Sequence, residues 1–383
     1  MVTAIVTIIM FLVMVSLHEF GHFITGRLLN FKILEYSIGF GPAVWHSKKS
    51  EIQYSLRAIP FGGYCKFEGE DEASEDKRAF SNQPVWKRMI VVAAGGIVNI
   101  ILGFVLFLII VPACSPMVTN VIDEVVENSY IEEQGILPGD EVVEINGRGV
   151  SFYNDIALYT QDFTAGEECE MVIKRGGEKL SFTFKPSESV TDYVYTEEGI
   201  EVSESMNGVS AGTQLYKYGE GAERDESKIG TAETVTRLII GFRPRYEDVT
   251  ALNVWGEAWN QTRFMVKIVY NSLWQLVTGR AGIDQMSGPV GIVSEVSSAV
   301  HSGESSWLQI LNLTALLTIN LGVFNLLPIP ALDGGRLLFM IIELIRRKPI
   351  PPDKEGMVHA IGFLLLIALI VFVSFNDIMR LIR

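Results

Sequence analysis

The strongest chemical signal in this sequence is the stretch His18-Glu19-Phe20-Gly21-His22. Residues four apart lie on one face of a helix, so the two imidazoles can bind the same metal ion. Glu19 can accept a proton from a water that the metal activates. Zn²⁺ binds imidazole and carboxylate groups, and a catalytic zinc keeps three protein ligands and one open position. The stretch therefore predicts a zinc hydrolase with His18 and His22 as two ligands and Glu19 as the general base.

The residues around these two histidines bear on where the predicted metal site lies. An apolar run from Val2 to Phe23 contains them, and ionisable groups in a membrane span are costly and treated as functional by default. The two rings could instead be polar residues that pack between helices. A cleaved signal peptide is disfavoured, because no basic region and no obvious small-residue cleavage site are present. We interpret the run as a retained span, which places the predicted metal site within the bilayer.

A third ligand has to come from a distant part of the chain. The candidates in or near apolar segments are Asp333, Glu343, His359 and Asp377. Asp333 follows an apolar run broken by Pro328 and Pro330, and broken backbone at membrane depth is tolerated where it lines a cavity. Local sequence leaves open an ordinary helix-capping aspartate at Asp333 and a plain polar residue of the last span at His359.

The elements that must hold these residues are apolar segments about 20 residues long, enough to cross a bilayer. Hydrophobic residues make up 48% of the 383-residue chain. Positive residues favour the cytoplasmic side, and they are concentrated in residues 27–88 and 336–354. Both termini are then expected outside, with the active site toward the cytoplasm. The expected spans are residues 1–29, 88–112, 306–335 and 356–376.

The long segment between the second and third spans is acidic, with a net charge of −17 over residues 113–305. Apolar alternation and Gly and Asp turns predict a compact, water-soluble, β-rich domain over residues 115–246. Residues 190–230 are rich in Glu, Ser and Gly, so we expect a loop-like insertion there, followed by a strand at 234–242. Residues 251–305 are expected to hold an amphipathic helix with an aromatic-rich face and a linker.

Composition also excludes several functions. No basic stripe is present, so nucleic-acid binding is not expected. The three cysteines are far apart and odd in number, which supports neither a disulfide framework nor a CxxC zinc site. Residues 30–87 contain turn signals around short strand-like segments, at Ala43–His46 and Ile52–Leu56, and predict a β-hairpin region.

Two motifs taken together resemble the site-2 protease family of intramembrane zinc metalloproteases. They are His18-Glu19-Phe20-Gly21-His22 and Asn325-Leu326-Leu327-Pro328-Ile329-Pro330-Ala331-Leu332-Asp333-Gly334, which meets each specified position of NxxPxPxLDG. The bacterial regulator-of-sigma-factor branch with a single PDZ domain is the most similar. The resemblance implies that His18, His22 and Asp333 bind zinc, that Glu19 is the general base, and that Asn325 holds substrate or stabilises the oxyanion.

Weaker matches extend the resemblance along the chain. Gly62, Gly63 and Tyr64 look like part of the family's membrane-associated β-hairpin, a candidate substrate-binding strand. Residues 288–292 resemble its segment before the third span. One departure is Gly96, where the family usually has proline; it involves no ligand. The segment that looks like the family's PDZ domain, and its candidate peptide-binding residues, are Leu137, Pro138, Gly139 and Asp140.

The resemblance implies a multi-pass α-helical membrane protein of about four spans, with a membrane-associated β-hairpin region and an inserted extracytoplasmic PDZ domain. It would lie in the bacterial plasma membrane and hydrolyse a peptide bond within the transmembrane segment of single-span proteins. An anti-sigma factor already trimmed outside is the favoured substrate. Alternatives are a membrane-tethered pro-factor, remnant signal peptides, or a non-catalytic PDZ scaffold. Retention of Glu19 argues against the scaffold.

Overall fold

The chain folds into two compact units, which we describe separately. The computed structural model describes residues 1–49, 51–70, 74–218, 226, 228–280, 282, 288–303, 306–348 and 350–382. The helical unit comprises Met1–Ala113 and Ala251–Arg383, and the β unit comprises Cys114–Thr250. The β unit is thus inserted into the sequence of the helical unit.

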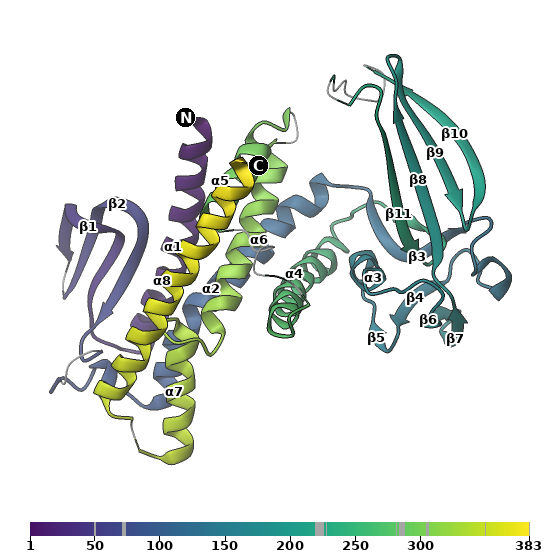
Figure 1. Cartoon of the computed structure of the whole chain (residues 1–383). Helices are drawn as coiled ribbons and strands as arrows, with labels where there is room; N and C mark the ends of the chain where they lie inside the picture. Colours follow the sequence, from purple (N-terminus) through teal and green to yellow (C-terminus); the bar gives the residue numbers. More distant parts are fainter. Residues whose placement is uncertain are drawn as a thin grey trace. The chain divides into compact units, whose positions relative to one another are not determined.

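Four helices of the helical unit are long and apolar enough to cross a membrane (Figure 1). They are α1 (Val2–Leu28), α2 (Val85–Ala113), α6 (Ser306–Leu326) and the stretch Asp353–Arg380 of α8 (Pro352–Ile382). Three further helices complete the unit: α4 (Val254–Val277), α5 (Pro289–Val300) and α7 (Asp333–Arg346). The four expected spans therefore correspond to four apolar helices, with ends shifted by a few residues.

The third expected span is split in two. Within residues 306–335, α6 ends at Leu326 and α7 begins at Asp333, with the break at the two prolines that the sequence indicates. Pro328 and Pro330 lie in the gap; proline has no N–H to donate and its ring clashes with the preceding turn of a helix. The break exposes backbone between the two helices and sets Asp333 at the start of a new helix.

Glycines bring the central helices into close contact. A Cβ atom on Gly96 of α2 would lie 2.8 Å from the carbonyl oxygen of Gly322 in α6, and one on Gly322 would lie 2.6 Å from that of Gly96. Small residues let helix backbones approach in this way where hydrophobic burial cannot drive association. The missing side chain of Gly96 is thus used for α2–α6 packing.

The hairpin region forms a small sheet beside α1 (Figure 1). Its strands are β1 (Ile33–Lys49) and β2 (Ile52–Phe67), both longer than the two short strands expected. The first part of β1, residues 33–38, has register partners in both 63–67 and 53–56. The chain therefore folds back on itself, and residues 63–67 form an edge of the sheet that lies against α1.

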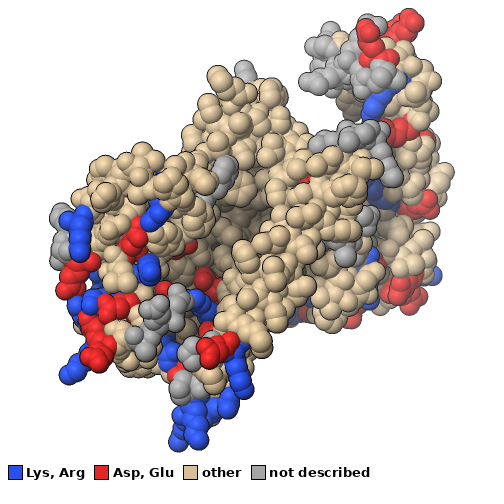
Figure 2. Space-filling view, turned by 60° about the vertical axis from the view of Figure 1, so that its left-hand side comes forward, with Lys and Arg blue, Asp and Glu red and all other residues tan. Residues whose placement is uncertain are grey.

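Charged side chains gather at one end of the helical unit, and the apolar helices show a wide uncharged surface (Figure 2). Arg346, Arg347 and Lys348 are exposed at this end. A helix surface without Lys, Arg, Asp or Glu is compatible with lipid, whereas the charged end requires water or headgroups.

The β unit contains two sheets. One has the strand order β12-β3-β4-β6-β7, with β5 paired to β4, and the other has the order β10-β9-β8-β11. One short helix, α3 (Tyr153–Thr160), packs against the first sheet, whose core includes Ile122, Ile145, Met171 and Ile173. The strands are β3 (Met117–Val125), β4 (Glu141–Ile145), β5 (Arg148–Gly149), β6 (Cys169–Arg175), β7 (Glu178–Phe184), β8 (Ser187–Tyr195), β9 (Gly199–Met206), β10 (Val209–Lys217), β11 (Ala232–Ile239) and β12 (Phe242–Glu247).

The prediction of a loop-like insertion at residues 190–230 is wrong. Residues 190–218 of this segment are largely strand, with β8, β9 and β10 paired in antiparallel register. The sequence hid these strands because β10 is exposed throughout and β8 and β9 are mostly half-buried on both faces, so no apolar alternation marks a buried face. The single strand expected at 234–242 is likewise two strands, divided at Gly241, which has φ +107°.

Candidate metal centre

Three side chains from distant segments converge between α1, α2 and α7. The Nε2 atoms of His18 and His22 lie 3.2 Å apart, and Oδ2 of Asp333 lies 3.2 Å from the first and 3.3 Å from the second. Both histidines are almost completely buried, with 8% and 9% of their surface exposed. Among the described residues, this is the one group of three or more His, Cys, Asp or Glu close enough to share a metal ion.

The helix period and a glycine bring the two imidazoles together. His18 and His22 are one turn apart on α1, so their rings project from one face. That face meets Gly95 of α2, where a Cβ atom would lie 2.3 Å from Nε2 of His22 and 2.7 Å from Cε1 of His18. On α1, a Cβ on Gly21 would clash with the carbonyl oxygen of Ala94 in α2, only 2.6 Å away. Glycine at position 95 thus leaves room for the two rings, and glycine at position 21 lets the two helices approach.

The break after α6 carries Asp333 to the same point. Asp333 is the first residue of α7, and the next two positions are glycines packed on the break itself. A Cβ on Gly334 would lie 1.9 Å from the Leu327 carbonyl oxygen, and one on Gly335 would lie 2.5 Å from that of Ile329. The tight fold of this segment fixes the direction in which the Asp333 carboxylate leaves the backbone.

The far side of each imidazole ring is also held. Nδ1 of His22 lies 2.9 Å from the carbonyl oxygen of Val91; because a carbonyl only accepts, Nδ1 carries the proton and Nε2 presents a lone pair to the centre. Nδ1 of His18 lies 3.5 Å from the side-chain amide of the fully buried Asn99. Rotation of that amide by 180° would place its oxygen toward the ring, where it could accept the Nδ1 proton.

The donor set fits a zinc ion. Tetrahedral ligands at about 2.0–2.1 Å from zinc are roughly 3.3 Å from one another, which matches the three separations above. Oδ2 of Asp333 is buried and has no hydrogen-bond partner, and a buried carboxylate oxygen between two imidazole lone pairs requires a cation. Two imidazoles and one carboxylate form a typical catalytic zinc set.

Glu19 lies at the edge of this centre, between α1 and the β1-β2 sheet. The backbone N–H of Cys65 donates a hydrogen bond to its carboxylate. A Cβ on the buried Gly63 would lie 3.3 Å from Cγ of Glu19. The edge of the sheet at residues 63–67 therefore runs past the glutamate, and its position is set by main-chain groups.

The other residues singled out in the sequence are more scattered. Asn325 lies in the last turn of α6, and its side chain makes no hydrogen bond to another described residue. Tyr64 is held by Arg57, which donates to its hydroxyl and to Glu35. Gly62 has φ +90° and packs under the ring of Phe40, where a Cβ would lie 1.9 Å away.

Leu137, Pro138, Gly139 and Asp140 form the turn before β4 in the β unit. Asp140 accepts two hydrogen bonds from Arg175, both 2.7 Å long, and one from the backbone N–H of Leu137 at 2.8 Å. Burial would raise the pKa of Asp140, but these bonds outweigh it and hold the pKa below its usual range. The contacts of this turn are therefore structural, with Asp140 tying the turn to β6.

The three remaining candidates for the third ligand have other partners. Glu343 accepts a hydrogen bond from Arg88 at 2.6 Å. Asp377 caps the start of α5, accepting from the backbone N–H groups of Gly288 and Gly291 at 2.9 and 2.8 Å. His359 accepts a hydrogen bond from the backbone N–H of Ala331 at 2.9 Å. Asn99, which contacts His18, is not singled out in the sequence analysis; its position on α2 four residues, about one helical turn, after Gly95 was the available signal.

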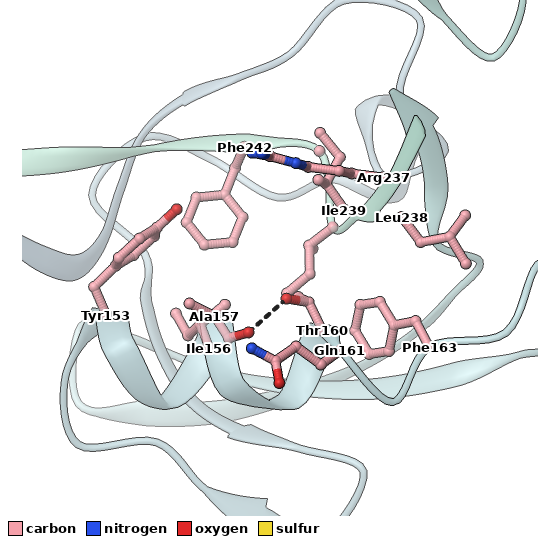
Figure 3. Close-up of a pocket in the computed structure, with 12 residues that line it drawn as sticks. Tyr153, Ile156, Ala157, Thr160, Gln161, Phe163, Arg237, Leu238, Ile239 and Phe242 are labelled. Carbon is pink, nitrogen blue, oxygen red and sulfur yellow. Dashed lines mark hydrogen bonds between the residues drawn. The ribbon is translucent and has the colours of Figure 1, made fainter. Parts of the chain in front are cut away.

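A pocket lies within the β unit (Figure 3). This pocket of about 610 Å³ is lined by α3 on one side and by residues 237–242 on the other. Tyr153, Ile156 and Phe242 give it apolar walls, and Arg237 supplies a positive charge. Strand β12, which begins at Phe242, is terminal in the order of its sheet. The residues of the turn before β4 do not line this pocket.

Comparison with known proteins gives matches along nearly the whole chain. The model of peptidase family M50 matches residues 6–369. A zinc metalloprotease of Clostridium acetobutylicum is 34% identical over 374 residues, which cover 98% of this chain and 96% of the relative. The regulator of sigma-W protease of Bacillus subtilis is 28% identical over 99% of both chains, and zinc metalloprotease RasP of Oceanobacillus iheyensis is 28% identical over the full length of both.

Proposed function

Because this chain belongs to peptidase family M50, the site-2 proteases, and is a bacterial membrane zinc metalloprotease of regulated intramembrane proteolysis, we propose which residues act and what they cut. His18, His22 and Asp333 hold the zinc, Glu19 is the general base, and the substrate is the membrane segment of a single-span protein. The observation that carries this proposal is the convergence of three donor atoms within 3.3 Å of one another among helices long enough to span a membrane.

The chemistry follows from the position of Glu19. Zinc, when bound, supplies a Lewis acid that acidifies water and polarises a carbonyl oxygen. Glu19 takes a proton from the attacking water and delivers it to the leaving amine. The hydrogen bond from the Cys65 N–H keeps its carboxylate directed to the centre. Asn325, at the end of α6, donates to the carbonyl oxygen as negative charge develops on it.

The sheet edge beside Glu19 supplies the means of holding substrate. A peptide bond within a helix is shielded and hydrogen-bonded, so the substrate must unwind before attack. Residues 62–64 run along an edge that passes Glu19, and an extended segment can add to such an edge by main-chain hydrogen bonds. Gly63 has no side chain to stand between that segment and the glutamate.

We propose that the β unit is a peptide-docking PDZ domain and that it lies outside the membrane, supported by its terminal strand β12 and the pocket beside it. An extended chain can pair with the terminal strand β12 and rest its side chains in the apolar pocket against α3. A docking domain of this size can admit substrates already shortened outside and exclude longer ones. We therefore propose a trimmed anti-sigma factor as substrate, supported by the similarity to the regulator of sigma-W protease.

Side of action follows from charge. The exposed basic residues of the α7–α8 segment and those of the hairpin region favour the cytoplasm. We therefore propose that the general base Glu19 and the metal centre face the cytoplasmic side. A membrane-tethered pro-factor or remnant signal peptides would be processed by the same chemistry and remain second candidates.

The proposed substrate class can be tested in cells. Cells that carry Glu19→Gln in place of the wild-type protein are expected to accumulate single-span membrane proteins that have lost their outer part. Quantitative proteomics with mapping of new termini measures this. Accumulation of an anti-sigma factor supports the proposal, whereas accumulation of signal-peptide remnants alone would contradict the proposed substrate.

The ligand assignment is tested on purified protein. Asp333→Ala is expected to weaken zinc binding by several orders of magnitude, because two imidazoles alone seldom retain catalytic zinc. Competition with a chromogenic chelator measures the affinity. Glu343→Ala, which removes a carboxylate paired with Arg88 instead, serves as the matched control. Unchanged affinity in the Asp333 variant would refute its role as a ligand.

A further inference from the structure

The backbone of the break between α6 and α7 has one donor that the break itself cannot satisfy. Residues 327–332 contain two prolines, which leaves four backbone N–H groups. Three donate locally: Leu327 to Phe324, Ile329 to Leu327, and Leu332 to Ile329. The fourth belongs to Ala331, two positions before Asp333, and donates to Nδ1 of His359 at 2.9 Å. An unpaired N–H at membrane depth is costly, so this bond is a condition for the observed backbone.

The geometry defines which form of the His359 ring is present. A backbone N–H can only donate, so Nδ1 must present a lone pair and the ring proton lies on Nε2. Nε2 is buried and without a hydrogen-bond partner, and the ring packs against Phe339 of α7 with centroids 5.6 Å apart. The Ala331 N–H is thus the single hydrogen bond of this ring within the described part of the chain.

The conformation supported by His359 is one that the loop would not adopt unaided. Ala331 has φ +76°, a left-handed backbone that residues with a Cβ seldom adopt. Helix α8 lies directly against this segment: a Cβ on Gly362 would lie 2.4 Å from Cβ of Pro330 and 2.8 Å from its carbonyl carbon. Strained backbone persists where surrounding structure determines it, and here that structure is one face of α8.

We propose that His359 is a positioning residue for the metal centre: through its Nδ1 acceptor, the fourth apolar helix holds the break in the conformation that directs the Asp333 carboxylate to His18 and His22. Gly362 assists by allowing α8 to approach. The inference rests on the proposed role of Asp333 as a ligand. It gives α8, which contributes no donor to the centre, a direct effect on metal affinity.

The test compares two amide side chains, Asn and Gln, introduced in place of His359 in the full-length protein in detergent micelles. Asn at position 359 can place its oxygen near the position of Nδ1, whereas the longer Gln carries its amide toward that of Nε2. Loss of an outer-shell partner lowers metal affinity by about 10–100-fold, so we expect this loss in His359→Ala and His359→Gln. His359→Asn should bind zinc within a few-fold of wild type. Zinc affinity by chelator competition is the readout, with cleavage measured in parallel.

Two further variants make the result decisive. Phe363→Ala, on the exposed side of α8, should keep wild-type affinity, and Gly362→Ala should weaken binding like His359→Ala by pushing α8 from Pro330. Wild-type affinity in His359→Ala, or equal weakening in the Asn and Ala variants, would overturn the inference. Asp333→Ala is measured alongside: if it loses zinc while His359→Ala does not, only the positioning role fails, and if it retains zinc, the ligand assignment itself fails. Where His359→Ala does not fold, the comparison of Asn with Gln decides.

Discussion

At the scale of single residues, each imidazole of the candidate metal centre is oriented by a different group on the far side of its ring. His22 has a fixed partner, the Val91 carbonyl, which belongs to the backbone and cannot be removed by substitution. His18 has the side chain of Asn99, at a separation of 3.5 Å. The two rings therefore differ in their sensitivity to mutation, and the effect of losing an outer partner can be measured at His18 alone.

Substituting Asn99 with Ala is expected to lower zinc affinity by about 10-fold or more, because it removes the amide whose oxygen, turned toward the ring, accepts the Nδ1 proton of His18. The contact that joins α2 to α6 here, from Thr318 Oγ1 to the backbone oxygen of Asn99, does not involve the side chain and should survive. Chelator competition measures the affinity, and Asn320→Ala in α6 is the control. Equal affinities in the two variants would show that Asn99 only joins helices.

The pair Asp140–Arg175 gives a pH dependence in the β unit. The folded pKa of Asp140 lies below its unfolded value of about 3.9. Its contribution to stability is therefore fully present above that value and is lost as pH falls through the folded pKa. In Asp140→Asn we expect a loss of about 2 kcal/mol near neutral pH and a weaker dependence on pH below about 5. Hydrogen exchange of β4 and β6 amides measures both. The same pH profile in wild type and variant would contradict the assignment.

At the scale of elements, the α1–α2 contact shapes the metal centre through Gly21 and Gly95. The side of α2 that meets α1 has no room for a methyl group, since the position a Cβ would take on Gly95 is 2.3 Å from a ligand nitrogen. In contrast, no other described part of the chain comes within 4 Å of the Cβ position of Gly256 in α4, apart from its chain neighbours and the nearby backbone of its own helix. Comparing alanine substitutions at Gly95 and Gly256 therefore distinguishes an effect of helix packing from the general effect of helix propensity.

Gly95→Ala is expected to abolish zinc binding, or to weaken it by more than 100-fold, because α1 and α2 must separate or His22 must rotate away. Gly256→Ala should bind zinc normally and be slightly more stable, since alanine favours helix over glycine by about 1 kcal/mol. Metal content after purification, together with the melting temperature of the metal-free protein, measures both effects. Normal zinc affinity in Gly95→Ala would contradict the packing described here.

The sequence predicted features that depend on neighbouring residues along the chain. It did not predict features that depend on how closely distant segments pack. The period of α1 alone predicted that His18 and His22 share a face, and two prolines predicted the break before Asp333. His359 could not be assigned, because its role depends on the closeness of α8 to Pro330, which no local pattern records. The strands β8–β10 were missed for a different reason: β10 is exposed along its whole length and most residues of β8 and β9 are half-buried on both faces, so the apolar alternation that marks strands is absent.

At the scale of the whole molecule, the distribution of charge distinguishes surfaces suited to lipid from surfaces suited to water. The apolar helices present an uncharged surface while charge gathers at one end of the helical unit (Figure 2). The inserted segment is acidic, and the net charge of −17 over residues 113–305 leaves the remainder slightly positive. Such a division is expected for a protein that works in a bilayer and meets its substrate partly in water.

The central claim, hydrolysis inside the membrane by the centre at Glu19, is tested most directly with purified protein and a single-span substrate in lipid nanodiscs. Mass spectrometry of the products locates the new termini. The wild type is expected to cut within the membrane segment, whereas Glu19→Gln should retain about one zinc and cleave about 10³-fold more slowly, as loss of a general base predicts. Cleavage by Glu19→Gln at the wild-type rate, or wild-type cuts only outside the membrane segment, would contradict the account.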